Sequence, residues 1–373
     1  MSYAANELMA EDAMVRELLK PLAGFLALPG VTEVVVNRPG EVFVEAGPHW
    51  TRHDAPELTL ARCRSLATAI ASYCDQRVDA GTPLLTALLP GTERVHIILP
   101  PVAEPGTVSI TARVPDLAPR SFDDYQRDGF FSRYVWARSS HTTQRQHEFD
   151  ALERTLIAHL ESGRLARFIE LAVRHKLNTV FVGDTGCGKT SLMKAVCRFI
   201  PADERLVTIE DVRELFLPDH PNRVHLLYSK GIQGTATVAP ADLIACSMRM
   251  KPDRVLLAEL RGGEAFDFLK LLTTGHRGSL STFHAESCAL ALERYVLMCK
   301  EHPHAAIYDA QALKRLVALT IDVIIHIRVE RIYADDGTPL RKQRYISEVS
   351  YDPAGKQSAR FGGAHLYFAG GTP

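Results

Sequence analysis

The hydrophobic pattern of the first 113 residues combines one amphipathic helix with a run of short strands. Residues 5–28 carry apolar side chains at helical spacing, and Pro29-Gly30 ends the segment. Strands in a run, with helices kept to one end, predict an α+β domain built on an antiparallel sheet. The predicted strands are 31–36, 41–45, 84–89, 94–99 and 107–113, with a helix at about 60–76 between the second and third.

The second half of the chain alternates between short apolar strands and amphipathic helices. Parallel strands need crossover helices, so this alternation predicts an α/β domain with a parallel sheet and a ligand at the carboxyl ends of its strands. Two final strands, 320–329 and 341–351, flank Asp336-Gly337 and predict a hairpin at the sheet edge. The other predicted strands are 179–182, 205–209, 254–257 and 279–283, and the helices are 189–199, 241–250, 263–274, 288–301 and 309–318.

Between these halves the periodicity is lost from residue 115 to about 149. Residues 138–147 are polar and aperiodic, which is typical of an interdomain linker. We therefore expect a smaller α+β domain at 1–137, a linker at 138–160 and the α/β domain at 161–373.

One stretch of the second half fills the pattern G-x-x-x-x-G-K-[ST] from Gly183 to Thr190. A predicted strand precedes it and a predicted helix follows, which is the context that turns a string match into a phosphate site. Its backbone N–H groups can cradle phosphates at a helix N-terminus, Lys189 can reach the β- and γ-phosphates, and Thr190 can bind Mg²⁺. The candidate ATP-binding residues are Gly183, Asp184, Thr185, Gly186, Cys187, Gly188, Lys189, Thr190 and Ser191.

Carboxylates end two of the predicted strands. Glu259 follows the apolar strand 254–257 in the manner of a Walker B acid, so we expect it to act on the metal and the attacking water. Glu210 and Asp211 end strand 205–209, and one of them is a candidate for the same work. The alternative for Glu259 is capping of the next helix, for which Glu264 is the better candidate. The alternative for Glu210 and Asp211 is helix capping or a surface ion pair.

Two histidines, His276 and His284, flank the strand 279–283. A histidine beside a phosphate loop can sense the γ-phosphate, and we expect this role for His284 and consider it for His276. The alternative for both is a structural hydrogen-bond donor.

Composition and charge bear on the partners and the location expected for the protein. The 373 residues are 46% hydrophobic with a net charge of −1, so no electrostatic attraction for nucleic acid, and no stable direct DNA binding, is expected. No basic segment followed by an apolar run begins the chain, and no run of 18 apolar residues occurs, so a cytoplasmic location is expected.

Seven cysteines without a C-x-x-C pair indicate neither a zinc site nor a disulfide framework. Among them Cys187 is expected to react fastest, because a helix N-terminus and Lys189 favour its thiolate.

Four motifs together resemble the secretion ATPases, and most closely the hexameric traffic ATPases of type IV secretion and conjugation systems. They are the P-loop, Thr208-Ile-Glu-Asp211, Glu259-Leu-Arg-Gly-Gly-Glu-Ala265 and Thr274-Gly-His-Arg-Gly-Ser-Leu-Ser-Thr-Phe-His-Ala-Glu-Ser287. Glu93-Arg-Val-His-Ile-Ile-Leu-Pro-Pro101 and Ser109-Ile-Thr-Ala-Arg113 resemble the N-terminal motifs of the family. Asp184 and Cys187 depart from its usual P-loop residues, and the segment from about 130 to 150 is long.

This resemblance implies a homohexameric ring, a RecA-like C-terminal domain and nucleotide held in the cleft between the domains. It also implies attachment at the cytoplasmic face of the inner membrane. Other secretion ATPases and inner-membrane components of the secretion machine are the implied partners. The function expected is ATP hydrolysis that drives substrate translocation or pilus assembly.

Arg113 is the candidate arginine for the charge that develops on the transferred phosphate, because it ends the strand 107–113 and can project from the sheet edge. Arg94 is the reserve candidate, and an ion pair with Asp116 is the structural alternative. For the whole chain, the alternatives are a RecA-like ring helicase or DNA translocase, a scaffold that binds ATP with little turnover, and a pilus or type II secretion ATPase. The four-cysteine metal module of type II members is absent from the sequence.

Overall fold

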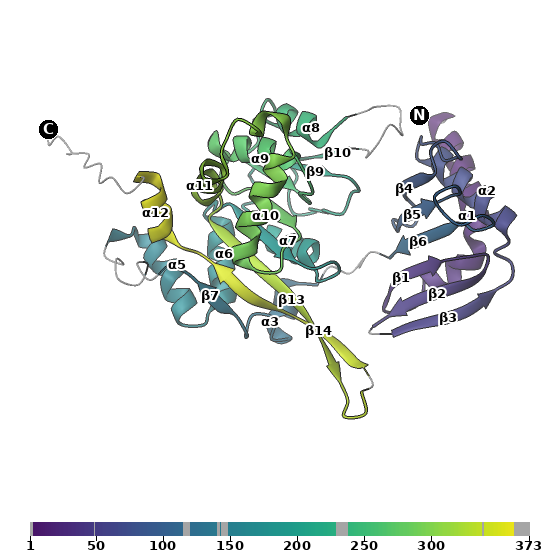
Figure 1. Cartoon of the computed structure of the whole chain (residues 1–373), viewed down its shortest axis with the longest axis horizontal. Helices are drawn as coiled ribbons and strands as arrows, with labels where there is room; N and C mark the ends of the chain where they lie inside the picture. Colours follow the sequence, from purple (N-terminus) through teal and green to yellow (C-terminus); the bar gives the residue numbers. More distant parts are fainter. Residues whose placement is uncertain are drawn as a thin grey trace. The chain divides into compact units, whose positions relative to one another are not determined.

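The chain forms two compact units, which Figure 1 shows in a computed structural model. The first unit comprises residues 1–118, 228–239 and 330–343, and the second comprises 119–227, 240–329 and 344–373. The residues that the structure describes are 3–47, 49–114, 120–139, 142, 148–228, 238–337 and 339–361.

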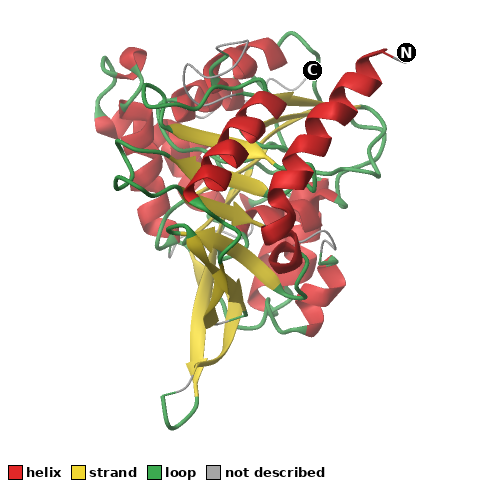
Figure 2. Ribbon diagram, turned by 90° about the vertical axis from the view of Figure 1, so that its right-hand side faces the viewer, coloured by secondary structure: helices red, strands yellow, loops and turns green. Residues whose placement is uncertain are grey.

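The first unit is built on an antiparallel six-stranded sheet with the order β3-β2-β1-β6-β5-β4. Helices α1 and α2 pack on each other, and α1 also packs on β1 (Figures 1 and 2). Apolar side chains alternate along β1, β5 and β6, so one sheet face is buried, as expected for a sheet covered on one side. The elements are α1 (Tyr3–Leu26), β1 (Val31–Val36), β2 (Gly40–Ala46), β3 (His49–Ala55), α2 (Leu60–Tyr73), β4 (Leu84–Leu88), β5 (Arg94–Ile98) and β6 (Ser109–Arg113).

The second unit contains an eight-stranded sheet with the order β10-β9-β11-β12-β8-β13-β14-β7. Strands β10, β9, β11, β12, β8 and β13 are parallel where they pair, as the alternating pattern predicts. The central strands are buried at every position, which is typical of a sheet with helices on both faces. The strands are β7 (Val135–Ala137), β8 (Thr179–Gly183), β9 (Leu206–Glu210), β10 (Arg223–Leu227), β11 (Arg254–Leu257), β12 (Leu280–Phe283), β13 (Val323–Tyr333) and β14 (Pro339–Ser350).

The helices of the second unit pack in two groups, one containing α3, α5, α6 and α7 and the other containing α8 to α12. Five of these helices, α7 to α11, follow the ranges predicted from the sequence closely. No helix among the described residues combines the length and the hydropathy needed to cross a membrane. The helices are α3 (Phe122–Arg127), α5 (Ala151–Glu161), α6 (Leu165–Arg174), α7 (Lys189–Cys197), α8 (Pro240–Ser247), α9 (Glu264–Thr273), α10 (Cys288–Lys300), the 3₁₀ helix η2 (Pro303–Ala305), α11 (Ala310–Thr320) and α12 (Pro353–Phe361).

The division of the chain into units differs from the boundaries expected from the sequence. Residues 119–137, expected in the first domain, belong to the second unit, because the aromatic side chains of α3 join its core and β7 pairs with β14. Conversely, residues 228–239 and 330–343 belong to the first unit. The expected linker at 138–160 includes α5, which packs against α6, while residues 140, 141 and 143–147 lie outside the described residues. The added β7 also means that the β13–β14 hairpin does not form the sheet edge.

The order of the strands determines which loops come together. Strands β9, β11, β12 and β8 are neighbours and run in the same direction, so the residues that follow them meet at one edge of the sheet. Those residues are Asp211, Glu259, His284 and the phosphate loop after Gly183. Each of the four motifs therefore contributes residues to the carboxyl ends of these parallel strands.

Candidate active site

The phosphate loop connects the buried strand β8 to the first turn of α7. Gly183, Gly186 and Gly188 have φ angles of 147°, 72° and 96°, a region of backbone conformation that other residues rarely adopt. Asp184, Thr185, Gly186 and Ser191 are exposed, whereas Gly188 and Thr190 are half-buried. The glycines thus allow a tight turn whose outermost residues remain exposed.

Lys189 lies inside this loop and is 7% exposed. Its Nζ donates to the carbonyl oxygens of Gly183 at 2.9 Å and Asp184 at 2.8 Å. The same nitrogen lies 3.4 Å from Nδ1 of His284. The P-loop lysine therefore contacts the loop that follows β12, as the sequence predicts for a residue that shares a site with His284.

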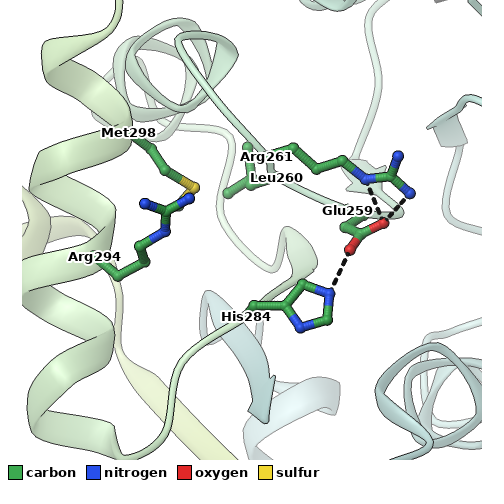
Figure 3. A pocket seen from close by; sticks show the side chains of 6 residues that line it. All are labelled: Glu259, Leu260, Arg261, His284, Arg294 and Met298. Carbon is green, nitrogen blue, oxygen red and sulfur yellow. Dashed lines mark hydrogen bonds and ion pairs between the residues drawn. The ribbon is translucent and has the colours of Figure 1, made fainter. Parts of the chain in front are cut away.

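His284 in turn contacts Glu259, which follows β11. The Nε2 atom of His284 lies 3.1 Å from Oε1 of Glu259, and Figure 3 shows the two side chains pointing toward one another. Burial lowers the pKa of His284, and the positive charge of Lys189 lowers it further, against the raising effect of Glu259. Lys189, His284 and Glu259, three candidates from separate motifs, form one continuous group.

Arg261 extends this group, although no role for it is predicted from the sequence. Its Nε donates to Oε2 of Glu259 at 2.6 Å, its Nη2 pairs with the same oxygen, and its Nη1 lies 3.3 Å from Oδ2 of Asp211. The spacing within Glu259-Leu260-Arg261 was an available signal, since residues i and i+2 of an extended segment share a face. Asp211 rather than Glu210 is therefore the acid of its motif that approaches Glu259 through Arg261.

A pocket of about 290 Å³ adjoins Glu259. Arg294 and Met298 on α10 approach it from the side opposite Arg261, as Figure 3 shows. The pocket is lined by Glu259, Leu260, Arg261, His284, Arg294 and Met298. The pocket thus brings Arg294 of α10 to the same space as Glu259, Arg261 and His284.

Glu210 ends β9 at the same sheet edge but is fully buried. Its Oε1 accepts the backbone N–H groups of Glu214 at 2.9 Å and Leu215 at 2.8 Å, and its Oε2 accepts from the Thr208 hydroxyl at 3.3 Å. Burial raises the pKa of this carboxyl. These contacts give Glu210 a structural task in the turn that follows β9, and its catalytic role stays a prediction.

His276 is separated from His284 by the strand β12. It lies in the loop before β12, where its Nδ1 is 3.1 Å from the Thr274 hydroxyl, whereas His284 follows the strand. Because the phosphate loop lies at the carboxyl end of the parallel strands, the structure brings His284 to it and not His276. A catalytic role for His276 stays a prediction without support from this geometry.

Arg113 ends β6 in the first unit, with a side chain that is 50% exposed. Its Nε lies 3.6 Å from Oε1 of Glu33, the residue opposite it on β1. Arg94 lies opposite Arg113 on β5, so the two candidate arginines are cross-strand neighbours. Asp116, the partner considered from the sequence, lies outside the described residues.

The structure contradicts the reactivity expected for Cys187. Its side chain is fully buried in the core of the second unit, and burial raises the pKa of the thiol. The nearby charge of Lys189 lowers this pKa, but desolvation is the larger effect. The helix N-terminus and the lysine were the correct neighbours, but the side chain lies in the core rather than on the exposed side of the loop.

The oxygen donors near the phosphate loop fit magnesium better than a softer metal. Thr190 offers a hydroxyl on the first turn of α7, and Glu259 and Asp211 offer carboxylates at adjacent strand ends. Within the described part of the chain, no three His, Cys, Asp or Glu side chains gather closely enough to hold a metal by themselves. Magnesium commonly takes one or two protein oxygens and completes its shell with phosphates and water, so this donor set suits Mg²⁺ that arrives with ATP.

Comparison with known proteins agrees with this site. The sequence profile of the family described as "Type II/IV secretion system protein" matches residues 143–360, which contain all four motifs around the phosphate loop. The chain is 41% identical over 366 residues to the type IV secretion system protein VirB11 of Brucella suis, covering 96% of this chain and 97% of that protein. It is 40% identical over 332 residues to the PtlH homologue of Bordetella bronchiseptica, covering 86% of this chain and 95% of the relative.

A solved structure extends the similarity to the fold. This structure is the VirB11 ATPase of the Brucella suis type IV secretion system in complex with sulphate. The match covers 95% of this chain and 99% of that chain, with a TM-score of 0.51 and 41% identity. The pilus retraction motor PilT with bound ADP matches with a TM-score of 0.55 at 14% identity, covering 92% of this chain and 85% of that one, which supports the shared fold alone. The chain therefore belongs to the type II/IV secretion system protein family, and its near full-length relatives place it among the ATPases of type IV secretion.

Proposed function

We propose that this chain is the hexameric motor of a type IV secretion or conjugation system, and that the group around Lys189 hydrolyses ATP. The observation that carries the proposal is the unbroken set of contacts from Lys189 through His284 to Glu259. It joins a phosphate-binding lysine to a carboxylate that can orient water, across a distance set by three adjacent parallel strands. A phosphate cradle alone would bind nucleotide without hydrolysing it.

Binding begins with an exchange of partners at Lys189. Its ammonium group donates to two carbonyl oxygens of its own loop. The phosphates of ATP are stronger acceptors for an ammonium group than neutral carbonyls, so Lys189 transfers its hydrogen bonds to them. The backbone N–H groups from Gly186 to Thr190 and the N-terminus of α7 supply the remaining donors.

Hydrolysis requires water to attack the γ-phosphorus while the bond to the bridging oxygen of ADP breaks. Glu259 orients the water and accepts its proton, and the proton is later released with orthophosphate. The negative charge that moves to the β-phosphate is met by Lys189 and by the loop amides. Mg²⁺, held by Thr190 and Glu259 together with the phosphates, would neutralise part of the same charge.

The finer biological assignments follow the family resemblance. They comprise a homohexamer that is peripheral to the cytoplasmic face of the inner membrane and works with other secretion ATPases and inner-membrane components. Nucleotide-dependent movement of one unit against the other would do work on the transported substrate or on a pilus. Light scattering of the purified chain tests the hexamer directly, because six copies and one copy differ clearly in mass.

Two substitutions in the purified protein test the proposed chemistry. Lys189→Ala should abolish phosphate release and weaken ATP binding, because a mobile positive charge on the β- and γ-phosphates is lost. Glu259→Gln should lower turnover by about 10²- to 10⁴-fold, the usual range for a general base, yet keep ATP bound because the cradle is intact. Glu293→Gln is the matched control, since this exposed acid on α10 pairs with Lys314 outside the site.

The outcomes separate the proposal from its alternatives. Turnover of Glu259→Gln near the wild-type rate would remove Glu259 as the catalytic acid and make Glu210 the next candidate. Turnover that rises strongly with single-stranded DNA would favour a helicase or DNA translocase. A wild-type protein that binds ATP but releases no phosphate would favour a scaffold.

A further inference from the structure

The phosphate loop has a cationic neighbour that no sequence motif indicates. Arg344 lies on β14, and its Nε donates to the carbonyl oxygen of Gly186 at 3.2 Å. Its Cδ lies 3.8 Å from the position that a Cβ would occupy on Gly188. The arginine therefore packs along the loop between its second and third glycines.

The strand order explains how a residue so late in the chain reaches this loop. Strand β13 pairs in parallel with β8, and Ile327 lies opposite Gly183 at the start of the loop. The carbonyl oxygen of Ile327 is close enough to Gly183 that a Cβ there would lie 2.3 Å from it. Strand β14 follows β13 in the sheet, so Arg344 extends past β13 toward the loop.

The bond to Gly186 controls one peptide unit. In a trans peptide the C=O and the following N–H point to opposite sides. When Arg344 holds the Gly186 carbonyl, the N–H of Cys187 is directed away from the arginine. That N–H makes only a long bond of 3.4 Å to the Asp184 carbonyl within the loop, which a phosphate oxygen can replace.

The loop is fixed on its other side by the buried side chain of Cys187. This side chain is fully enclosed, and its Sγ lies close to Gly183, 2.9 Å from the position of a Cβ there. The Gly186–Cys187 peptide is thus held by Arg344 at its carbonyl and by the core at its following side chain. A phosphate loop works through the direction of its amides, so the two anchors act on the feature that binds the ligand.

We propose that Arg344 is a positioning residue for nucleotide binding, and that it holds the Gly186–Cys187 peptide in the orientation that receives the β-phosphate. The inference rests on the proposed ATP site. Because the β-phosphate is present in both ADP and ATP, Arg344 supports both ligands equally. It takes no part in the transfer of the γ-phosphate.

Calorimetric titration of the full-length protein with MgADP, and with a non-hydrolysable MgATP analogue, tests this inference. Arg344→Gln should raise both dissociation constants about tenfold, the scale expected for one hydrogen bond from a charged donor. The turnover number at saturating ATP should stay within about twofold of wild type. Arg344→Lys should recover part of the affinity, because an ammonium group can still donate to the carbonyl.

The control is Arg341→Gln, which removes an exposed arginine from the same strand. Unchanged dissociation constants in Arg344→Gln would overturn the inference while leaving the proposed function intact. Weakened binding of the ATP analogue alone would also overturn it, because that pattern belongs to a γ-phosphate contact. If Arg344→Gln melts well below wild type without nucleotide, Arg344→Lys decides by the same two titrations. Absence of nucleotide binding in the wild-type protein would instead overturn the proposed function and this inference with it.

Discussion

Nε2 of His284 lies 3.1 Å from Oε1 of Glu259, and the other ring nitrogen of this histidine faces Nζ of Lys189 at 3.4 Å. The ammonium group of Lys189 can donate hydrogen bonds but cannot accept them. Nδ1 of His284 must therefore accept the hydrogen bond from Lys189, and Nε2 must carry the proton. Burial and Lys189 lower the pKa of His284, which keeps the ring neutral at pH 7 and allows this tautomer. The histidine therefore donates to the Glu259 carboxylate and accepts from the Lys189 ammonium group.

Replacing His284 with Asn should reduce turnover more than nucleotide binding. The lost N–H···O bond to the Glu259 carboxylate is worth about 2 kcal/mol, which corresponds to roughly 30-fold in rate. The affinity for ADP should change by only a few-fold, since the loop amides and Lys189 remain. Steady-state phosphate release and ADP titration measure the two effects. His49→Asn, an exposed change in the first unit, is the control. Full turnover of His284→Asn would show that Glu259 needs no hydrogen-bond donor from His284.

The elements that the sequence predicts well are those whose burial is uniform. Strands β8, β11 and β12 are buried at every position and carry mostly apolar or β-branched side chains, so their ranges are visible without any tertiary information. Strand β3 has the sequence His49-Trp-Thr-Arg-His-Asp-Ala55 and is exposed along most of its length, and β10 is only half-buried. Both are edge strands held by main-chain pairing to one neighbour, so neither shows the uniform burial of the central strands.

Thiol labelling tests whether Cys187 is protected by burial, as the structure shows, or reactive, as its sequence neighbours predict. Cys246 on α8 is exposed and should be alkylated first, whereas Cys187 should react only when the second unit opens. Peptide mapping after brief treatment with iodoacetamide measures both rates, and Cys246→Ser should remove the fast signal. Rapid labelling of Cys187 that ATP suppresses would contradict the burial.

Gly183 is the glycine of the phosphate loop that should tolerate substitution least. A Cβ at this position would lie 2.3 Å from the Ile327 carbonyl oxygen, and φ is 147°. Gly183→Ala should cost about 3 kcal/mol, since the overpacking adds to the backbone strain. Gly163→Ala is the control, because its φ of 69° carries similar strain with nothing within 4 Å, and about 1 kcal/mol is expected. Thermal unfolding of the two variants should differ by several degrees, and equal melting temperatures would contradict the close contact.

The site could be predicted where its residues share a motif and not where only tertiary structure joins them. Lys189, Glu259 and His284 each follow a recognisable strand, and parallel topology brings such positions together. Arg344 lies 158 residues from Gly186 along the chain and reaches it only through the pairing of β8, β13 and β14. For Cys187 the sequence predicts a lowered thiol pKa from its neighbours Lys189 and the helix N-terminus. Burial, which the sequence does not show, has the larger effect and raises the pKa of the thiol.

Arg113, the candidate arginine of the first unit, makes a weak ion pair that another anion could replace. Arg113 pairs with Glu33 at 3.6 Å while its side chain is half exposed. Ion pairs this accessible to water contribute about 0–1 kcal/mol to stability. An anionic phosphate can therefore replace Glu33 as the partner of Arg113 at little cost. The guanidinium group would then meet the charge that develops on the transferred phosphate.

Arg113→Ala should leave the fold and most of the ATP affinity unchanged but lower turnover on the order of 10³-fold, the usual scale for an arginine finger. The matched control is Arg52→Ala, since Arg52 is a similarly exposed arginine of the same sheet that pairs with Glu41 at 2.8 Å. Both variants lose a surface ion pair, so any shared change in melting temperature reports that loss alone. Turnover and ATP affinity should be measured in parallel on the purified proteins. If Arg113→Ala retains turnover within a few-fold of wild type, Arg113 does not act on the nucleotide, and its cross-strand neighbour Arg94 becomes the residue to replace.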